Sequence, residues 1–234
     1  HYILAAERSS SLALDPAGNL VDVARSIDSW LGQFLSLALA ASHRGEAASV
    51  FKNITFINFN YDRTIEQFIF WALCARAGLD QNSAAEVVSS LNVIRPYGSL
   101  GKLDWRSRHE VAYGEAQRRD LFTISKNIRT FTEQMEDNDI TEKIDEVIES
   151  AKLILFLGFG FHQQNIALFS PGPGRRRTSL TRVLATSLGI DQHNYSAIAH
   201  KLENSCGIRQ AALFALTAGK LLKDLRPTIA MSVS

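Results

Sequence analysis

The segment from Lys152 to Gly158 constrains the fold more than any other part of the chain. Residues 153–157 read Leu-Ile-Leu-Phe-Leu, an apolar run without interruption, and a glycine follows it directly. Such a run is typical of a strand that is covered on both faces, as the strands of a parallel sheet are. The segment therefore predicts an α/β protein in which helices lie against both faces of a sheet.

Helix-like and strand-like segments alternate along the rest of the chain. Clusters of β-branched and aliphatic residues predict further strands at residues 54–58, 91–95 and 183–188. Apolar residues recur at helical spacing, which predicts helices at residues 20–38, 63–77, 139–151, 195–202 and 211–225. The polar segment 78–83 predicts a loop. This alternation favours a doubly wound, mostly parallel sheet.

Composition excludes several kinds of partner. The 234 residues are enough for one domain, or for one domain and a smaller module. A formal net charge of +1 gives no reason to expect nucleic acid or a membrane surface as a partner. No apolar stretch approaches the roughly 18 residues that a membrane-spanning helix needs.

Two cysteines, Cys74 and Cys206, are too few for a four-cysteine zinc site, and the histidines do not stand at metal-ligand spacing from a cysteine or an aspartate, so we expect no zinc and no other metal. Free thiols in a reducing, cytoplasmic compartment are the expected state of both. The sequence begins with His1 rather than an initiator methionine, from which we expect residues upstream.

Polar side chains follow the strand expected at residues 54–58. Asn60 and Asp62 lie where this strand gives way to the helix expected from Arg63. In open α/β sheets, ligands bind outside the carboxyl ends of the strands, where an asparagine and an aspartate can hold a ribose hydroxyl or a carboxamide. The structural alternative is that Asp62 caps the helix and Asn60 is a turn residue.

Two glycines follow the apolar run at residues 153–157. Gly158 and Gly160 would let the backbone approach a ribose or a phosphate closely, because neither carries a Cβ. A complete G-x-G-x-x-G fingerprint would need glycine at Gln163, so the dinucleotide-binding motif is incomplete. From these residues alone, a structural tight turn and a nucleotide-binding loop both remain open.

Three strand ends carry short motifs in a fixed order. They are Asn60-Tyr61-Asp62, then Tyr97-Gly98-Ser99-Leu100, and then Leu157-Gly158-Phe159-Gly160-Phe161 with Asn165-Ile166. Together they resemble the SIR2-like family, a bacterial branch of the sirtuin superfamily that includes NAD-consuming anti-phage defence factors. The resemblance covers residues 53–170 and implies a Rossmann-like NAD-binding domain with a helical insertion, for which residues 1–50 are the candidate.

The resemblance also implies roles for individual residues. Asn60 would contact the nicotinamide ribose or position a water near its anomeric carbon, and Asp62 would hold the nicotinamide side or cap the following helix. The other residues implied at the site are Tyr97 as a catalytic residue and Gly98, Ser99, Gly158, Gly160, Phe161 and Asn165 as cofactor-binding residues. The implied reaction cleaves the nicotinamide–ribose bond, which requires a stabilised oxocarbenium-like centre and a positioned water.

Two departures from the family pattern affect this inference. Tyr97 stands where the family has histidine, and a phenol with an ordinary pKa of about 10 is a poor base near neutral pH. Tyr97 can still donate a hydrogen bond or stack on the nicotinamide ribose. The first strand and the glycine-rich phosphate loop of the family are not found in this sequence; we expect them upstream of His1.

Two functions of different kinds follow. The first is hydrolysis of NAD to nicotinamide and ADP-ribose, and the second is a non-enzymatic module that senses NAD or ADP-ribose or acts as a scaffold. A protein deacylase is less attractive, because the cysteines of the sirtuin zinc module are lacking. We expect Asn60, Tyr97 and Gly158 to face one crevice, with NAD as the ligand and a protein partner or a second copy of the chain as a further partner.

Overall fold

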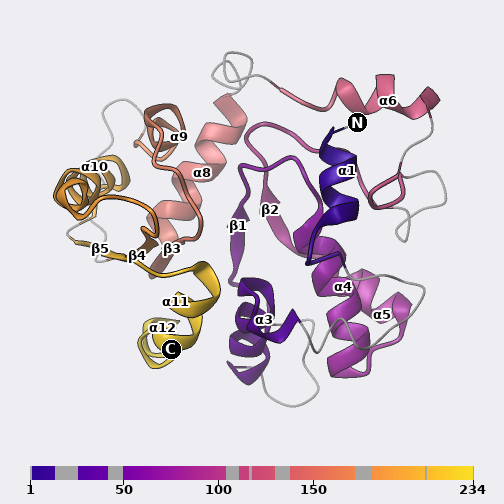
Figure 1. Ribbon diagram of the computed structural model, residues 1–234, viewed down its shortest axis with the longest axis horizontal. Coiled ribbons are helices and arrows are strands. Elements are labelled where there is room, and N and C mark those ends of the chain that lie inside the picture. Colours follow the sequence, from indigo (N-terminus) through magenta and orange to yellow (C-terminus); the bar gives the residue numbers. More distant parts are fainter. Residues whose placement is uncertain are drawn as a thin grey trace. The chain divides into compact units, whose positions relative to one another are not determined.

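The computed structural model describes residues 2–13, 26–41, 50–103, 111–115, 118–129, 138–171, 181–208 and 210–233. The chain forms two compact units, His1–Gln134 (unit 1) and Met135–Ser234 (unit 2), and Figure 1 labels the elements of each. Among these residues, each unit has a parallel sheet of its own, with two strands in unit 1 and three in unit 2. The expected α/β class is confirmed. A single doubly wound, Rossmann-like sheet stays a prediction, because the hydrogen-bonded strands form two sheets.

The sheet of unit 1 consists of strands β1 (Thr55–Ile57) and β2 (Asn92–Ile94). They run parallel, with Thr55 opposite Asn92 and Ile57 opposite Ile94. The amide of Asn58 continues the pairing by donating to the Ile94 carbonyl at 2.9 Å. Both strands lie inside the ranges expected from the sequence, and their carboxyl ends lead into the first two motifs.

Three helices of unit 1 build its main core. Helix α3 (Trp30–Ala41), helix α4 (Thr64–Ala77) and helix α5 (Gln81–Ser89) contribute the buried residues Leu31, Leu35, Phe68, Ile69, Leu73, Val87 and Val88. Helix α4 ends at Gly78, whose left-handed φ of 68° lets its amide bond back to the Leu73 carbonyl.

The loop expected at residues 78–83 is partly wrong, because helix α5 begins within it. The Asp80 side chain caps this helix by accepting from the amides of Asn82 and Ser83, at 2.9 and 3.1 Å. The polar composition that suggested a loop is therefore the composition of a helix start.

The single helix expected over residues 20–38 is also wrong in its described part. A short 3₁₀ helix, η1 (Ser26–Asp28), comes first, and α3 begins only at Trp30. Ser29 separates the two, and its hydroxyl accepts from the Gly32 amide at 3.1 Å in the manner of a helix N-cap. Residues 20–25, where the expected helix begins, lie outside the described residues.

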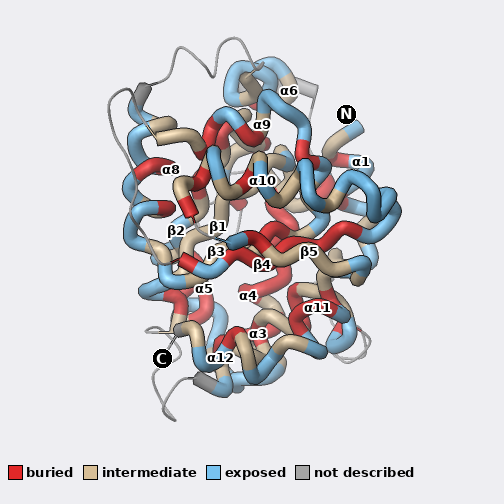
Figure 2. Tube along the Cα trace, turned by 90° about the vertical axis from the view of Figure 1, so that its left-hand side faces the viewer, coloured by how far each residue is buried: buried red, intermediate tan, exposed pale blue. Residues whose placement is uncertain are grey.

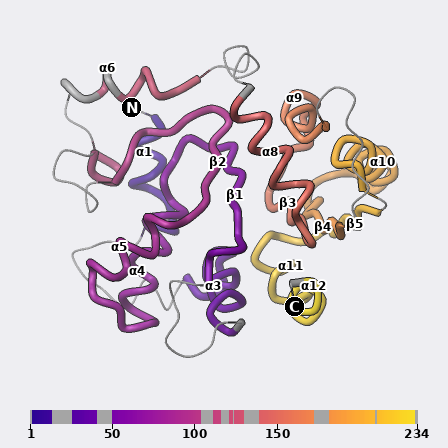
Figure 3. The backbone as a smooth tube through the Cα atoms, turned by 180° about the vertical axis from the view of Figure 1, so that it is seen from behind, coloured from indigo at the N-terminus to yellow at the C-terminus, as the bar shows by residue number. Residues whose placement is uncertain are grey.

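Two further helices of unit 1, α1 (Tyr2–Ser9) and α6 (Arg118–Ser125), meet a small second core. Its buried members are Leu4 of α1, Leu100 of the second motif and Ile124 of α6. In Figures 1 and 3, helix α1 lies beside the segment that leads from β2 into the second motif. The N-terminal helix is thus part of the packing around the first two motifs.

The sheet of unit 2 has the strand order β3 (Leu153–Phe156), β4 (Arg182–Thr186) and β5 (Ala211–Phe214), all parallel. Its central strand β4 is buried at four of five positions, as the red tube in Figure 2 shows. Helices α9 (Gln163–Ala167) and α10 (Tyr195–Cys206) lie on one side of the sheet, and α11 (Ala218–Asp224) and α12 (Arg226–Val233) lie on the other (Figures 1 and 2). The unit is completed by helix α8 (Asn138–Ser150) and the 3₁₀ helix η3 (Gln192–Asn194).

The helix expected over residues 211–225 is wrong in its first part. Residues 211–214 form strand β5, which pairs with β4 so that Ala185 lies opposite Leu213. The helix begins at Ala218, and the Thr217 hydroxyl caps it by accepting from the Lys220 amide at 3.3 Å. Within the described residues, no helix has the length and apolar character required to cross a bilayer.

Candidate functional site

The first two motifs meet at the carboxyl edge of the β1–β2 sheet. The rings of Phe59 and Tyr97 contact each other edge to face, with centroids 6.0 Å apart. The amide of Leu100 donates to the Tyr61 carbonyl at 3.4 Å. The turn that carries Asn60 and Asp62 is therefore held directly against the turn that carries Tyr97, Gly98 and Ser99.

Asn60 and Asp62 differ in what their side chains do. The Asn60 side chain is exposed and makes no hydrogen bond to the described part of the chain, although its backbone amide donates to Asn58 Oδ1 at 3.0 Å. Asp62 Oδ1 accepts from the Thr64 amide at 3.0 Å, while Arg63 occupies the N-cap position of α4. Asp62 thus supports the helix start, although it is not the cap itself, and Asn60 presents an unengaged amide group.

The second motif is pinned to residues 127–129. Tyr97 accepts a hydrogen bond on its carbonyl from the Arg129 amide at 2.9 Å, and the Ser99 amide donates to the Asn127 carbonyl at 3.3 Å. Gly98 has a φ of 81°, and a Cβ at this position would lie 1.8 Å from the Asn127 oxygen. Only glycine fits here, because a Cβ would collide with the backbone at residue 127. Gly98 therefore has a structural role in this turn.

The side chain of Tyr97 is protonated over the physiological pH range. Burial raises its pKa above the ordinary value of 10, and the neighbouring Tyr61 phenol raises it further. A neutral phenol donates a hydrogen bond and does not abstract a proton. The position at which the family resemblance implies a base is therefore occupied by a donor.

The third motif follows β3 in unit 2. Gly158 has a φ of 63°, its amide donates to Thr186 Oγ1 at 2.8 Å, and nothing lies within 4 Å of where a Cβ would be. Phe161 has a φ of 54°, the only positive value among the described non-glycine residues. Strained backbone of this kind clusters at functional sites.

The Phe161 side chain is turned inward. It is 8% exposed, and its ring contacts Phe156 and Phe159 at centroid distances of 6.2 and 5.4 Å. The expected contact of this residue with a cofactor can therefore involve its backbone rather than its ring. Gly160 is exposed on the same loop, and Asn165 is half-buried on α9.

Ser187 is a candidate that sequence reasoning missed. It follows β4 directly, next to the Thr186 hydroxyl that holds Gly158, and its own buried hydroxyl has no hydrogen-bond partner among the described residues. Because the strand was expected to extend to residue 188, Thr186 and Ser187 looked like interior strand positions. The strand ends at Thr186, which places Ser187 at the carboxyl edge of the sheet.

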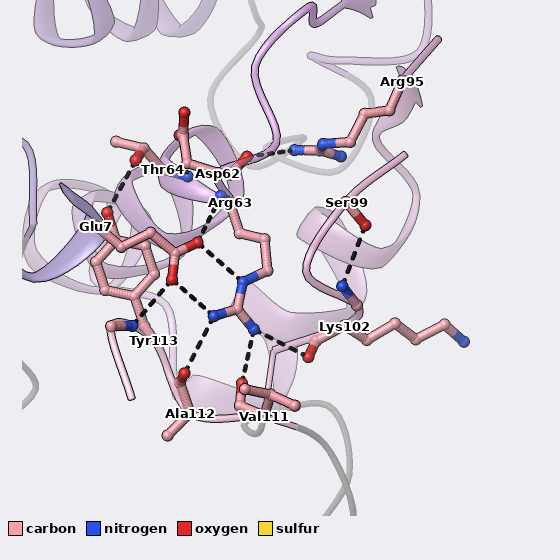
Figure 4. Close-up of polar contacts among 12 residues, drawn as sticks. Glu7, Asp62, Arg63, Thr64, Arg95, Ser99, Lys102, Val111, Ala112 and Tyr113 are labelled. Atoms are coloured by element: carbon pink, nitrogen blue, oxygen red, sulfur yellow. Dashed lines mark hydrogen bonds and ion pairs between the residues drawn. The ribbon is translucent and has the colours of Figure 1, made fainter. Parts of the chain in front are cut away.

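A buried ion pair between Glu7 and Arg63 lies next to the first motif, which Arg63 directly follows in the sequence. Arg63 and Glu7 are each 1% exposed. Glu7 Oε2 lies 2.7 Å from one Arg63 Nη, and Glu7 Oε1 accepts from both the Arg63 Nε and the Arg63 amide, at 3.0 and 2.8 Å (Figure 4). A two-point contact of this kind fixes the orientation of both groups.

The remaining donors of Arg63 reach a segment distant in sequence. They bond the carbonyls of Lys102, Val111 and Ala112 at 3.3, 2.7 and 3.0 Å, and the Gly114 amide returns a bond to Glu7 at 2.9 Å. Beside them, the Tyr113 hydroxyl lies 2.9 Å from Thr64 Oγ1, and burial raises the pKa of Tyr113 to about 12. Helix α1, the start of α4, residue 102 and residues 111–114 are thereby joined at one point.

A second ion pair, between Arg95 and Glu66, lies close to this network. The Arg95 guanidinium makes two bonds to Glu66, at 2.9 and 2.7 Å, and a third to the Asp62 carbonyl at 3.3 Å. Arg95 follows β2 and Glu66 lies on α4, so the pair fixes the helix to the strand end. The sequence indicates these two ion pairs only weakly, because each partner is a single charged residue beside an otherwise apolar segment.

The site residues expected from the sequence are divided between the two units. Asn60, Asp62, Tyr97, Gly98 and Ser99 belong to unit 1, whereas Gly158, Gly160, Phe161 and Asn165 belong to unit 2. A common crevice for Asn60, Tyr97 and Gly158 stays a prediction. In the described part of the chain, no three His, Cys, Asp or Glu side chains are grouped so as to hold a metal ion.

Comparisons of the chain with family models, with curated proteins and with solved structures find no match. The residues of the site therefore carry the functional inference.

Proposed function

We propose that this protein is a SIR2-like, NAD-binding enzyme that hydrolyses NAD to nicotinamide and ADP-ribose. One observation supports this most strongly: at the carboxyl edge of parallel strands, beside the Tyr97 turn, Asn60 presents an exposed side-chain amide that bonds none of the described residues. On the same turn, the carboxylate of Asp62 is engaged by the Thr64 amide and so has a structural role. An unengaged amide at a strand end instead fits a ligand-facing role.

In the proposed reaction, Asn60 holds the attacking water or a ribose hydroxyl near the anomeric carbon. The bond between nicotinamide and ribose breaks, positive charge develops on the ribose, and the water adds to that carbon. Asp62 lies on the same turn, and its carboxylate favours the developing charge electrostatically. The proton of the water leaves to solvent, so the products are nicotinamide, ADP-ribose and a proton.

Tyr97 enters this proposal as a hydrogen-bond donor. Its raised pKa keeps the phenol protonated, so it orients the ribose rather than activating the water. In unit 2, the glycines at positions 158 and 160 would let the backbone come close to a ribose or a phosphate. A cytoplasmic setting, and a role in anti-phage defence, belong to the same proposal through the family resemblance.

One observation favours a second candidate function. Because Tyr97 replaces a base with a donor, the same site fits a module that binds NAD or ADP-ribose without cleaving it. Such a module would sense the nucleotide or serve as a scaffold for a partner or for a second copy of the chain.

The test incubates the complete protein with NAD and measures nicotinamide and ADP-ribose together. We expect the two products in equal amounts. Bound NAD that stays intact would leave the sensing module as the function. Absence of both binding and turnover would overturn both candidates.

A further inference from the structure

Arg95 lies at the end of β2 and bonds both motifs of unit 1. Its guanidinium donates to the Asp62 carbonyl at 3.3 Å, in the turn that also carries Asn60 (Figure 4). Its own carbonyl accepts from the Gly98 amide at 3.1 Å. One residue is therefore attached to the first turn through its side chain and to the second turn through its backbone.

The backbone bond closes a β-turn over residues 95–98. Arg95 is the first residue of this turn, and Tyr97 is the third. Pro96 occupies the second position, where the fixed φ of proline favours such a turn. The backbone of Tyr97 is thus placed by the two residues that precede it.

Glu66 fixes the direction of the Arg95 side chain. Its two carboxylate oxygens accept from the two Nη atoms of Arg95, at 2.9 and 2.7 Å. A planar guanidinium that is held at two points keeps one orientation. The Nη atom that bonds Glu66 at 2.7 Å is also the one that reaches the Asp62 carbonyl, so the ion pair directs this donor at the first turn.

An ion pair in this position is a poor source of stability. Both side chains are largely buried, with 12% of Arg95 and 15% of Glu66 exposed. Burial of two charges costs desolvation free energy, and apolar residues of similar volume often stabilise a protein equally well or better. The geometry of the three bonds instead fits a role in orientation.

We propose that Arg95 is a positioning residue for the cleavage of NAD, an inference that rests on the proposed function. The proposed reaction needs the water held by Asn60 and the ribose oriented by Tyr97 at a fixed separation. These two groups lie on different turns, and Arg95 bonds both turns. Since a displacement of about 1 Å can cost about 10²-fold in rate, Arg95 influences turnover through Asn60 rather than through a contact with NAD.

Two variants and one control test this role. Arg95→Lys keeps the positive charge beside Glu66, but a single ammonium cannot reproduce the two-point contact and also reach the Asp62 carbonyl. Glu66→Gln keeps the shape of the side chain and leaves one acceptor oxygen for the guanidinium. Arg76→Lys is the control, because Arg76 is exposed near the end of α4 and bonds the Ser36 hydroxyl, away from both turns.

Steady-state nicotinamide release and amide hydrogen exchange are measured on the same preparations of the complete protein. We expect kcat to fall by about 10- to 10²-fold in Arg95→Lys and Glu66→Gln, with KM for NAD within about twofold of the parent. The Leu100 amide, which bonds the Tyr61 carbonyl across the two turns, should exchange about tenfold faster. The amide of Leu73, within α4, should exchange as in the parent, and Arg76→Lys should match the parent in every measurement.

Two results would overturn the positioning role in a parent that is active. They are an unchanged kcat in both variants, and equally faster exchange at Leu100 and Leu73, which would make Arg95 a residue of general stability. A parent that releases no nicotinamide would contradict the proposed hydrolysis itself. In that case faster exchange at Leu100 alone would support the role of Arg95 in joining the two turns, and unchanged exchange would overturn it.

Discussion

Asn60 and Arg63 lie three residues apart, and their surroundings give them opposite roles. Arg63 is buried, and its side chain bonds Glu7 and three backbone carbonyls. Asn60 is exposed, and its side chain bonds nothing in the described part of the chain. A buried charged group needs ion-pair and hydrogen-bond partners within the protein. A side-chain amide that binds a ligand needs hydrogen-bonding groups that the protein does not already occupy.

Only one of these two roles could be predicted from the sequence. Asn60 follows a recognisable strand, so its place at a strand end is a local property of the sequence. Arg63 takes its role from Glu7, which is 56 residues away, and no local pattern indicates that pairing. The position of Asn60 at a strand end could therefore be predicted, whereas the residue that holds its turn in place could not.

A prediction at this scale concerns Tyr97. If Asn60 holds the water, replacing the phenol should remove only one orienting hydrogen bond, worth about 0.5–1.5 kcal/mol, because a neutral phenol is not the base. We expect Tyr97→Phe and Tyr97→His to release nicotinamide within a few-fold of the parent rate, a margin well below the 10²–10⁴-fold of a positioned base. Below the ordinary tyrosine pKa of about 10, parent and Tyr97→Phe should show parallel pH–rate profiles.

The measurement is steady-state nicotinamide release by the complete protein and the two variants. A rise of about 10²-fold or more in Tyr97→His would show that the reaction needs a base which the parent lacks. That outcome would favour the sensing module as the function of the natural sequence.

At the scale of elements, sequence patterns succeeded where one signal dominated. The apolar run at residues 153–157 gave β3, and the helical spacing at 63–77 gave α4. Residues 211–214, Ala-Ala-Leu-Phe, consist largely of good helix formers and continue the spacing of the next helix. They form a strand because they pair with β4, which is a long-range contact that overrides local propensity.

The ion pair between Glu7 and Arg63 gives a prediction about the joining of α1 to α4. Glu7→Ala leaves a buried guanidinium without its counter-ion, and such losses cost about 3–5 kcal/mol of unfolding free energy. We expect a loss of that size by denaturant titration followed by circular dichroism.

Glu115→Ala is the matched control. Glu115 pairs with Arg8 at 3.9 Å, and both side chains are mostly exposed, at 67% and 74%. Exposed pairs contribute less than about 1 kcal/mol, so this variant should unfold like the parent. Equal losses in the two variants would mean that Glu7 is not buried as the structure has it.

At the scale of the whole molecule, the chain has two units, each with a parallel sheet and with turns of interest at the carboxyl ends of its strands. The order of the motifs along the chain could be predicted from the sequence, because each motif is local. The division into two sheets could not, because strand pairing joins segments that are distant in sequence.

The most direct test of the proposed NAD chemistry compares Asn60→Ala with the parent and with Asn82→Ala, which removes an exposed asparagine from the start of α5. Nicotinamide release and thermal melting are measured on the same preparations of the complete protein. We expect release to fall by about 10²-fold in Asn60→Ala alone, because the water or ribose is no longer positioned. In both variants, the melting temperature should shift only by the small amount typical of surface substitutions, which change the unfolding free energy by about 0.5 kcal/mol. Unchanged release in Asn60→Ala, together with a lowered melting temperature, would show that Asn60 is a turn residue and would contradict the proposed site.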